Sequence, residues 1–170
     1  MSLIYITGVE GAGKSTVCDE LLDAGYSAID LDTAELAQRY FKGSWQRPAN
    51  LPPATSNTLA WYADREWKVK PLDVQHLRAQ AVGEAILFVC GITDNFDQII
   101  CLTLDQPTVR ERLAGRTDNN FGKTPGEREY ILEKHQAYEA KNKEAGSIML
   151  DAAQPVIQVV NRILVSVALL

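Results

Sequence analysis

A glycine-rich octapeptide, GVEGAGKS, at residues 8–15 limits what this chain can fold into. It follows the β-prone run 3–7 and precedes an amphipathic segment, 14–24, that Gly25 closes. In a strand, turn and helix of this kind, inward backbone N–H groups and the helix N-terminus form a cradle for phosphate. The complete GxxxxGK[ST] pattern in this context therefore predicts a binding site for a nucleoside triphosphate.

The residue types of this motif predict individual roles. Lys14 is expected to reach the β- and γ-phosphates, and the Ser15 hydroxyl to ligate Mg²⁺. Thr16 is expected to donate a further hydrogen bond to the α-phosphate. The expected backbone positions of the cradle are Gly8, Gly11, Ala12 and Gly13. ATP and Mg²⁺ are thus the expected cofactors.

Strand-like and helix-like segments alternate along the chain. Strands are expected at 3–7, 26–30, 85–90, 98–104 and 147–150. Helices are expected at 14–24, from Asp32 or Thr33 to about Tyr40, at 59–68, at 73–81, from Asp105 and Pro107 to about Gly115, at 125–142 and from Pro155 onward. Such alternation favours parallel strands with right-handed crossovers. We therefore expect a three-layer α/β/α sandwich with a five-stranded parallel sheet.

Composition narrows the class of protein further. A length of 170 residues predicts one domain, and the net charge of −5 argues against a general nucleic-acid-binding surface. The three cysteines lack metal-ligand spacing, which favours reduced thiols in a cytoplasmic protein. The apolar segment 155–170 is too short to cross a bilayer. The expected partners are ATP and a small molecule, with neither nucleic acid nor a membrane.

Other nucleotide-binding classes fit the sequence less well. The base-reading NKxD string and the DxxG string of GTPases are both missing. A motor-type ATPase would end an apolar strand in Asp, but here the run ends at Cys90-Gly91, and Asp94 follows three residues later. What remains is a compact kinase that acts on a small molecule.

Three further segments carry a family resemblance. Residues 28–32, AIDLD, are similar to the DxD that closes the second strand of shikimate kinase-like enzymes. Residues 109–116 resemble the helix-to-lid junction, with arginines four apart, and 150–152 resemble the final strand. The chain thus resembles the P-loop nucleoside/nucleotide kinase group, which includes the adenylate, shikimate and gluconate kinases. The resemblance implies the P-loop NTPase fold of the nucleotide-kinase type, an acceptor-binding insertion at 33–83 and a lid at 112–126 within one domain, 1–170.

Basic residues gather where the resemblance places the lid. Between 109 and 128 lie five bases and three acids, against the acidic balance of the whole chain. Arg112 and Arg116 are one helical turn apart and share a face. By resemblance, Arg112 would lie against the adenine or the phosphates, and Arg116 would reach the transferred phosphoryl group. A solvated basic helix face is the alternative.

Asp30 and Asp32 are the acid–base candidates. Strand alternation puts both on the same side of the strand end. Asp30 could hold Mg²⁺ through water, and Asp32 could accept the proton of the acceptor hydroxyl. Alternatively, Asp32 with Glu35 forms a helix N-cap and its box partner. Asp94, just past a strand end, is a second metal or acceptor candidate.

The expected insertion is rich in arginine and tryptophan, namely Arg39, Arg65, Trp45, Trp61 and Trp67. These residue types suit an acceptor pocket, although tryptophans in a small subdomain also form its core. The acceptor half matches neither the shikimate nor the adenylate kinases in detail. The predicted function is transfer of the γ-phosphoryl group of Mg-ATP to a nucleoside, a nucleoside monophosphate or a hydroxylated metabolite. The alternative is an ATP-binding sensor or regulatory protein with little or no transferase activity.

Overall fold

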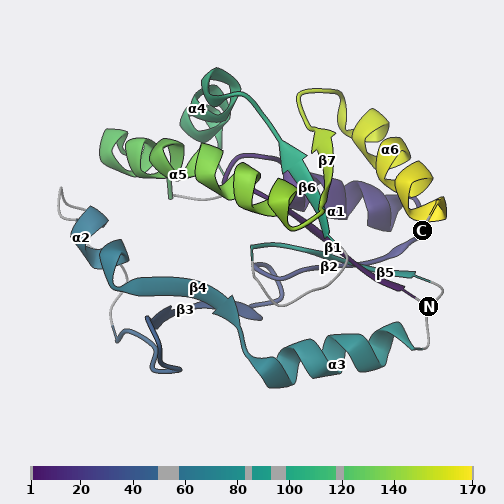
Figure 1. Cartoon of the computed structure of the whole chain (residues 1–170), viewed down its shortest axis with the longest axis horizontal. Coiled ribbons are helices and arrows are strands. Elements are labelled where there is room, and N and C mark those ends of the chain that lie inside the picture. The colour runs from purple at the N-terminus through teal and green to yellow at the C-terminus, as the bar shows by residue number, and fades with distance from the viewer. Residues whose placement is uncertain (1, 50–57, 83–85, 93–98, 118–120, 170) are drawn as a thin grey trace.

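A central parallel sheet organises the computed structural model, which describes residues 2–49, 58–82, 86–92, 99–117 and 121–169. Its five strands lie in the order β2-β5-β1-β6-β7 (Figure 1). Their bounds are β1 Ser2–Gly8, β2 Ser27–Asp30, β5 Ile86–Cys90, β6 Ile99–Thr103 and β7 Ile148–Asp151. β1 is central because it pairs with β5 on one side and β6 on the other. The expected five-stranded parallel sheet is confirmed.

Helices cover both faces of this sheet. Ile4 and Ile6 of β1 pack in one core cluster with α1 (Lys14–Asp23) and α6 (Val156–Ala168). Tyr5, on the opposite face of the strand, packs in a second cluster with α3 (Pro71–Ala81). Successive side chains of a strand point to opposite faces, so β1 is buried on both sides. The three-layer α/β/α sandwich is therefore confirmed.

Two helices follow β6 and flank the segment that the resemblance predicts to be a lid. α4 (Gln106–Gly115) begins at Asp105, whose carboxylate accepts a hydrogen bond from the Thr108 N–H at 2.7 Å. α5 (Pro125–Glu144) begins with a capping box in which Thr124 and Glu127 satisfy each other's backbone N–H groups. Both starts follow the predicted pattern of a cap and then proline. None of the described helices is long and apolar enough to cross a membrane.

The predicted helix from Asp32 or Thr33 to Tyr40 is wrong. One helical turn forms after β2, and the left-handed φ of 56° at Glu35 then ends it. The Leu36 N–H donates to the Leu31 carbonyl at 3.0 Å, which closes the turn in the manner of a Schellman motif. The chain continues as strand β3 (Ala37–Phe41).

The predicted helix at 59–68 is half right. α2 (Thr58–Ala63) ends early, and residues 65–69 form strand β4 (Arg65–Val69). β4 pairs antiparallel with β3, and Arg39 stands opposite Trp67 in the register. Each strand gains its hydrogen bonds from a distant segment, so tertiary pairing overrides the local helical pattern. Figure 1 shows this hairpin and α2 at the opposite end of the molecule from α6.

Candidate active site

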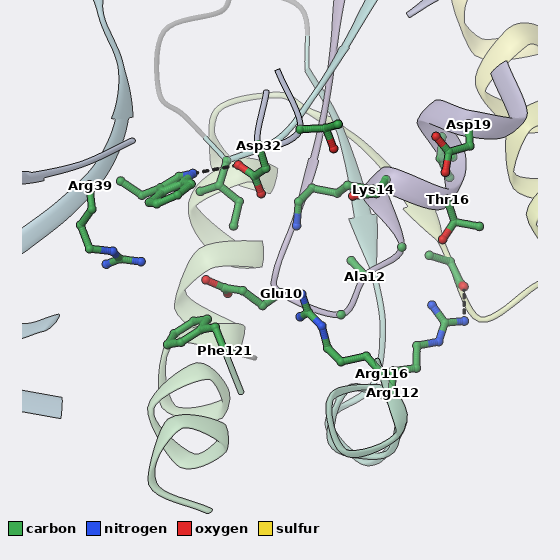
Figure 2. A pocket seen from close by; sticks show the side chains of 18 of the residues that line it. Glu10, Ala12, Lys14, Thr16, Asp19, Asp32, Arg39, Arg112, Arg116 and Phe121 are labelled. Carbon is green, nitrogen blue, oxygen red and sulfur yellow. Dashed lines mark hydrogen bonds between the residues drawn. The ribbon is translucent and has the colours of Figure 1, made fainter. Parts of the chain in front are cut away.

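A cavity of about 1090 Å³ lies where the glycine-rich loop, α4, the β3–β4 hairpin and α2 meet. Figure 2 shows Lys14 in the middle of this view, Arg39 to one side and Arg112 to the other. The cavity sits beyond the carboxyl end of β1, where open α/β sheets place their ligands. Of the predicted site residues, Gly11 to Thr16, Asp32, Arg112 and Arg116 line it, whereas Gly8 and Asp30 do not.

The glycine-rich loop packs tightly against the sheet at its start. A Cβ atom added at Gly8 would lie 2.7 Å from the Leu102 carbonyl oxygen and 2.9 Å from the Ala12 Cβ. At the other end of the loop, Gly13 has a left-handed φ of 92° and precedes the first residue of α1. Glycine is thus needed at both ends, for close approach at Gly8 and for backbone conformation at Gly13.

Lys14 turns back over this loop. Its Nζ donates hydrogen bonds to the carbonyl oxygens of Gly8 at 2.9 Å and Val9 at 3.0 Å. Burial lowers the pKa of Lys14 below its ordinary value, and Arg116 lowers it further, while Glu10 and Asp32 oppose the shift. Lys14, Arg116, Glu10 and Asp32 therefore lie close enough to act on one another electrostatically.

The two hydroxyls after Lys14 face the cavity. Ser15 and Thr16 are exposed there, and neither caps α1 with its side chain. Among the described residues, no group of three or more His, Cys, Asp or Glu side chains could hold a metal ion. Magnesium commonly binds with one or two protein ligands plus phosphate oxygens, so Ser15 beside the phosphate loop fits such a site.

Asp30 is engaged mainly in local structure. Its Oδ1 accepts hydrogen bonds from the backbone N–H groups of Asp32 at 2.8 Å and Thr33 at 3.1 Å. Asp30 therefore caps the single helical turn, which is the role that the sequence had offered as the alternative for Asp32. Because the helix 33–40 does not form, the capping alternative for Asp32 is wrong.

Asp32 is held by a tryptophan from the hairpin instead. The Trp67 Nε1–H donates to Asp32 Oδ1 at 3.1 Å, and both residues line the cavity (Figure 2). Although Asp32 keeps contact with solvent, partial desolvation in the cavity wall raises the pKa of its carboxyl above the ordinary value. Lys14 and the Trp67 hydrogen bond oppose that shift because both favour the ionised form.

α4 brings two arginines to the cavity. Arg112 Nη2 donates to the Ala152 carbonyl at 2.8 Å, which ties α4 to the loop after β7. Its other terminal nitrogen would lie 3.6 Å from a Cβ on Gly13, so the guanidinium lies beside the phosphate loop. Arg116, at the end of α4, also lines the cavity. The alternative of a wholly solvated basic helix face is therefore wrong for these two residues.

The other bases of the 109–128 segment lie outside the cavity lining. Arg110 forms an ion pair with Glu129 at 3.5 Å, and Arg128 donates to the backbone carbonyl of Lys123. Three of the five basic side chains that line the cavity lie outside the 109–128 segment. Five basic side chains (Lys14, Arg39, Arg47, Arg112, Arg116) and three acidic ones (Glu10, Asp19, Asp32) line the cavity. A protein of net charge −5 thus has a cavity with an excess of positive charge.

The hairpin and α2 supply the remaining wall. Arg39, Trp61 and Trp67 line the cavity, whereas Arg65 and Trp45 do not. Arg65 forms an ion pair with Asp64 and packs its guanidinium 4.3 Å from the centre of the Trp61 ring. The two alternatives given for the tryptophans, an acceptor pocket and a subdomain core, both apply to Trp61, which packs within the small subdomain and also lines the cavity.

Sequence reasoning missed several residues of the cavity, among them Glu10 and Phe121. Glu10 lies inside the octapeptide, and the presence of an acid in an expected anion cradle was a signal that could have found it. Phe121 was hidden in the polar segment expected to be a lid loop, where it is the one aromatic residue among 116–123. Asp94, the second metal candidate, lies outside the described residues.

Comparison with known proteins starts from sequence. No protein-family model matches the chain. A "Nucleotide-binding protein" from Polaromonas naphthalenivorans (strain CJ2) is 31% identical over 94 residues, which are 55% of this chain and 32% of that protein. The chain therefore spans about a third of the length of this relative.

Solved structures resemble the whole chain. A deoxyadenosine kinase from M. mycoides with its products dCMP and dCDP matches with a TM-score of 0.57 at 16% identity, over 99% of this chain and 100% of that one. A shikimate kinase from Acinetobacter baumannii in complex with shikimate matches with a TM-score of 0.58 at 11% identity, over 99% and 93%. A sugar kinase from Janibacter sp. HTCC2649 matches with a TM-score of 0.54 at 16% identity, over 97% and 93%. These likenesses concern the fold.

Proposed function

We propose that this chain, which has the fold of the P-loop nucleoside and nucleotide kinases, transfers the γ-phosphoryl group of Mg-ATP to a small-molecule acceptor. One observation carries the proposal: Lys14 of the phosphate loop, Arg116 at the C-terminal end of α4 and Asp32 after β2 line one cavity. Phosphoryl transfer needs positioning and neutralisation of charge on the transferred group, together with a base for the nucleophile. A protein that only binds a nucleotide does not need the last of these.

The proposed roles follow the chemistry of an in-line displacement. The acceptor hydroxyl oxygen forms the new bond to the γ-phosphorus, the bond to the bridging oxygen of ATP breaks, and ADP leaves with that electron pair. Asp32 takes the proton of the hydroxyl, while Lys14 and Arg116 neutralise charge on the phosphoryl group. Arg112 holds the donor nucleotide, and Mg²⁺ held by Ser15 and the phosphates supplies further charge neutralisation.

The cavity divides into two proposed halves. The donor half comprises the phosphate loop from Glu10 to Thr16, together with Arg112 of α4 and Arg116 at its C-terminal end. The acceptor half comprises the insertion 33–83, whose hairpin and α2 form the wall opposite. The segment 112–126 is the proposed lid. The raised pKa of Asp32 supports its role, because a base works best when its pKa lies nearer the operating pH.

A nucleotide-dependent sensor with little transferase activity is the second candidate. It is favoured by one observation, namely that the sequence relative is described only as a nucleotide-binding protein. The two candidates differ in turnover and agree in nucleotide binding. Both the Mg-ATP dissociation constant and the rate of ADP formation therefore have to be measured.

The test combines calorimetry with an activity panel. Mg-ATP is titrated into the wild type, Lys14→Ala and the surface control Lys143→Ala, and ADP formation is then followed with nucleosides, nucleoside monophosphates, sugars and hydroxy acids. We expect Lys14→Ala to weaken Mg-ATP binding by about tenfold or more, since one charged contact to phosphate contributes about 1.5–3 kcal/mol. Binding without turnover on any acceptor would favour the sensor. Failure of the wild type to bind Mg-ATP would overturn both candidates.

A further inference from the structure

Arg39 stands in an unusual environment within the acceptor half. Its guanidinium carbon lies 4.5 Å from the ring centre of Tyr62, 5.2 Å from Trp67, 5.9 Å from Phe121 and 6.0 Å from Trp61. The rings come from α2, from β4 and from the segment before α5, so three parts of the chain converge on one cation. All of them line the same cavity as Arg39.

These rings hold the cation without using its hydrogen-bond donors. Aromatic faces attract the guanidinium through their quadrupole, whereas its N–H groups need oxygen acceptors. Within the described ranges, no carboxylate, carbonyl or hydroxyl oxygen accepts a hydrogen bond from the Arg39 side chain. Burial lowers the pKa of Arg39, and Coulombic interactions with groups such as Tyr62 and Glu10 oppose that shift.

Two other arginines of the cavity are already engaged. Arg47 donates to the Gln38 side-chain oxygen at 2.8 Å, and Arg112 donates to the Ala152 carbonyl at 2.8 Å. Arg39 differs from both because its fork of donors is retained for something outside the described protein groups. A planar guanidinium held in this way matches the two oxygens of a carboxylate or a phosphate.

Arg39 and the proposed base Asp32 lie on either side of Trp67, so the acceptor would contact each of them with a different group. Trp67 pairs with Arg39 across the β3–β4 hairpin, and its indole N–H donates to Asp32 at 3.1 Å. One tryptophan therefore contacts both the proposed base and the aromatic-held arginine. A molecule lying over Trp67 would present one group to Asp32 and another to Arg39.

From this juxtaposition we infer that the acceptor is a hydroxylated organic anion, whose hydroxyl meets Asp32 and whose separate carboxylate or phosphate pairs with Arg39. This inference rests on the proposed function and narrows it. Neutral nucleosides and sugars would leave the Arg39 charge unpaired. A nucleoside monophosphate phosphorylated on its own phosphate would place that phosphate at the transfer site instead of at Arg39.

The activity test compares acceptors in matched pairs. ADP formation is measured for gluconate against glucose, for glycerate against glycerol, and for glycerol 3-phosphate against glycerol, which separates carboxylate from phosphate as the paired group. We expect kcat/KM for the preferred anion to exceed that of its neutral partner by about 10- to 100-fold, which is the contribution of hydrogen bonds to a charged group. Equal activity on both members of every pair, or activity on a nucleoside monophosphate alone, would overturn the inference.

Variants tie the preference to Arg39 itself. Arg39→Gln should raise KM for the anion by a much larger factor than KM for its neutral partner, so that the preference is lost, and Arg39→Lys should partly restore it. Arg65→Gln is the matched control, since Arg65 packs on rings of the same subdomain but does not line the cavity. Equal loss in Arg65→Gln and Arg39→Gln would mean that Arg39 only supports the fold, which would overturn the inference.

A binding measurement separates this inference from the proposed function. Inorganic phosphate is titrated into Lys14→Ala, whose phosphate loop is weakened, and tryptophan fluorescence reports on Trp61 and Trp67 beside Arg39. We expect saturable binding that the double variant Lys14→Ala/Arg39→Gln weakens by about tenfold or more. Such binding without any turnover would retain the anion site while rejecting the kinase. Identical titrations of the two variants would reject the anion site even if the kinase is active.

Discussion

The hydroxyl oxygens of Thr7 and Tyr138 lie 2.5 Å apart. This contact joins the C-terminal end of β1, just before the phosphate loop, to the middle of α5. Thr7 is fully buried and donates its own hydrogen to the Gly91 carbonyl at 2.9 Å, so Tyr138 is the donor in the pair. One threonine therefore connects β1, β5 and the helix that follows the proposed lid. This network fixes the strand end from which the phosphate loop begins.

Tyr138→Phe tests the strength of this connection. Removing one hydroxyl should lower the free energy of unfolding by about 0.5–1.5 kcal/mol, the usual net contribution of one hydrogen bond. Urea denaturation measures the change. Tyr130→Phe on the same helix is the control, because its hydroxyl accepts a hydrogen bond from Lys134 at an exposed position. If the two variants lose equal stability, the buried Thr7 contact has no special weight.

Arg116→Ala tests the proposed charge clamp. We expect kcat for ADP formation to fall by about 100-fold, as when one donor to a transition-state oxyanion is removed, while the dissociation constant of Mg-ATP changes little. Arg110→Ala is the matched control, because Arg110 lies on the same helix but pairs with Glu129 outside the cavity. An Arg116→Ala enzyme with unchanged turnover on its preferred acceptor would contradict the role given to α4.

The pH dependence of kcat/KM tests Asp32 as the base. Because desolvation raises the pKa of Asp32, the acid limb of the profile should lie above the ordinary aspartate value of about 3.9. Activity should rise with pH through that pKa, since the base acts in its ionised form. Asp32→Asn should lower kcat by about 100-fold or more and abolish the limb.

Trp67→Phe tests the direction in which the acid limb of the pH profile moves. The indole N–H stabilises the ionised carboxylate and lowers the pKa of Asp32, so its removal should move the acid limb to higher pH. Trp45→Phe, at an exposed tryptophan outside the cavity lining, should leave the limb where it is. A shift to lower pH in Trp67→Phe would show that another group titrates.

Gly8→Ala tests the tight seat of the phosphate loop. The new methyl would lie 2.7 Å from the Leu102 carbonyl oxygen, so the loop or β6 must move. We expect a loss of about 1–3 kcal/mol in the free energy of unfolding, as is usual for overpacking. Gly126→Ala adds a Cβ that meets no described atom within 4 Å beyond its chain neighbours and the backbone of its own helix, so it should leave stability unchanged or raise it by up to about 1 kcal/mol. Thermal and urea unfolding of both variants decide the matter.

The donor half was more predictable than the acceptor half. The positions from Gly11 to Thr16 line the cavity as expected, because their geometry depends on a local strand, turn and helix. The spacing of Arg112 and Arg116 predicted one shared helix face, and the family resemblance implied that this face lies at the nucleotide. By contrast, the local pattern at 33–40 and 59–68 predicted helices. The alternative role of Asp32 as an N-cap depended on the first of these helices and is wrong for the same reason. These segments form strands because each finds its hydrogen bonds in the other.

Taken alone, the amino-acid sequence determined the phosphate loop and the alternation of strands and helices, since each depends on contacts between near neighbours in the chain. The parallel sheet followed from that alternation, because a helix between two strands favours their parallel pairing. Only the tertiary structure decided which residues face the loop across the cavity. The β3–β4 pairing brings Trp67 to Asp32 and sets Arg39 among four rings. Contacts between distant segments depend on register and packing, which no local pattern of residues encodes.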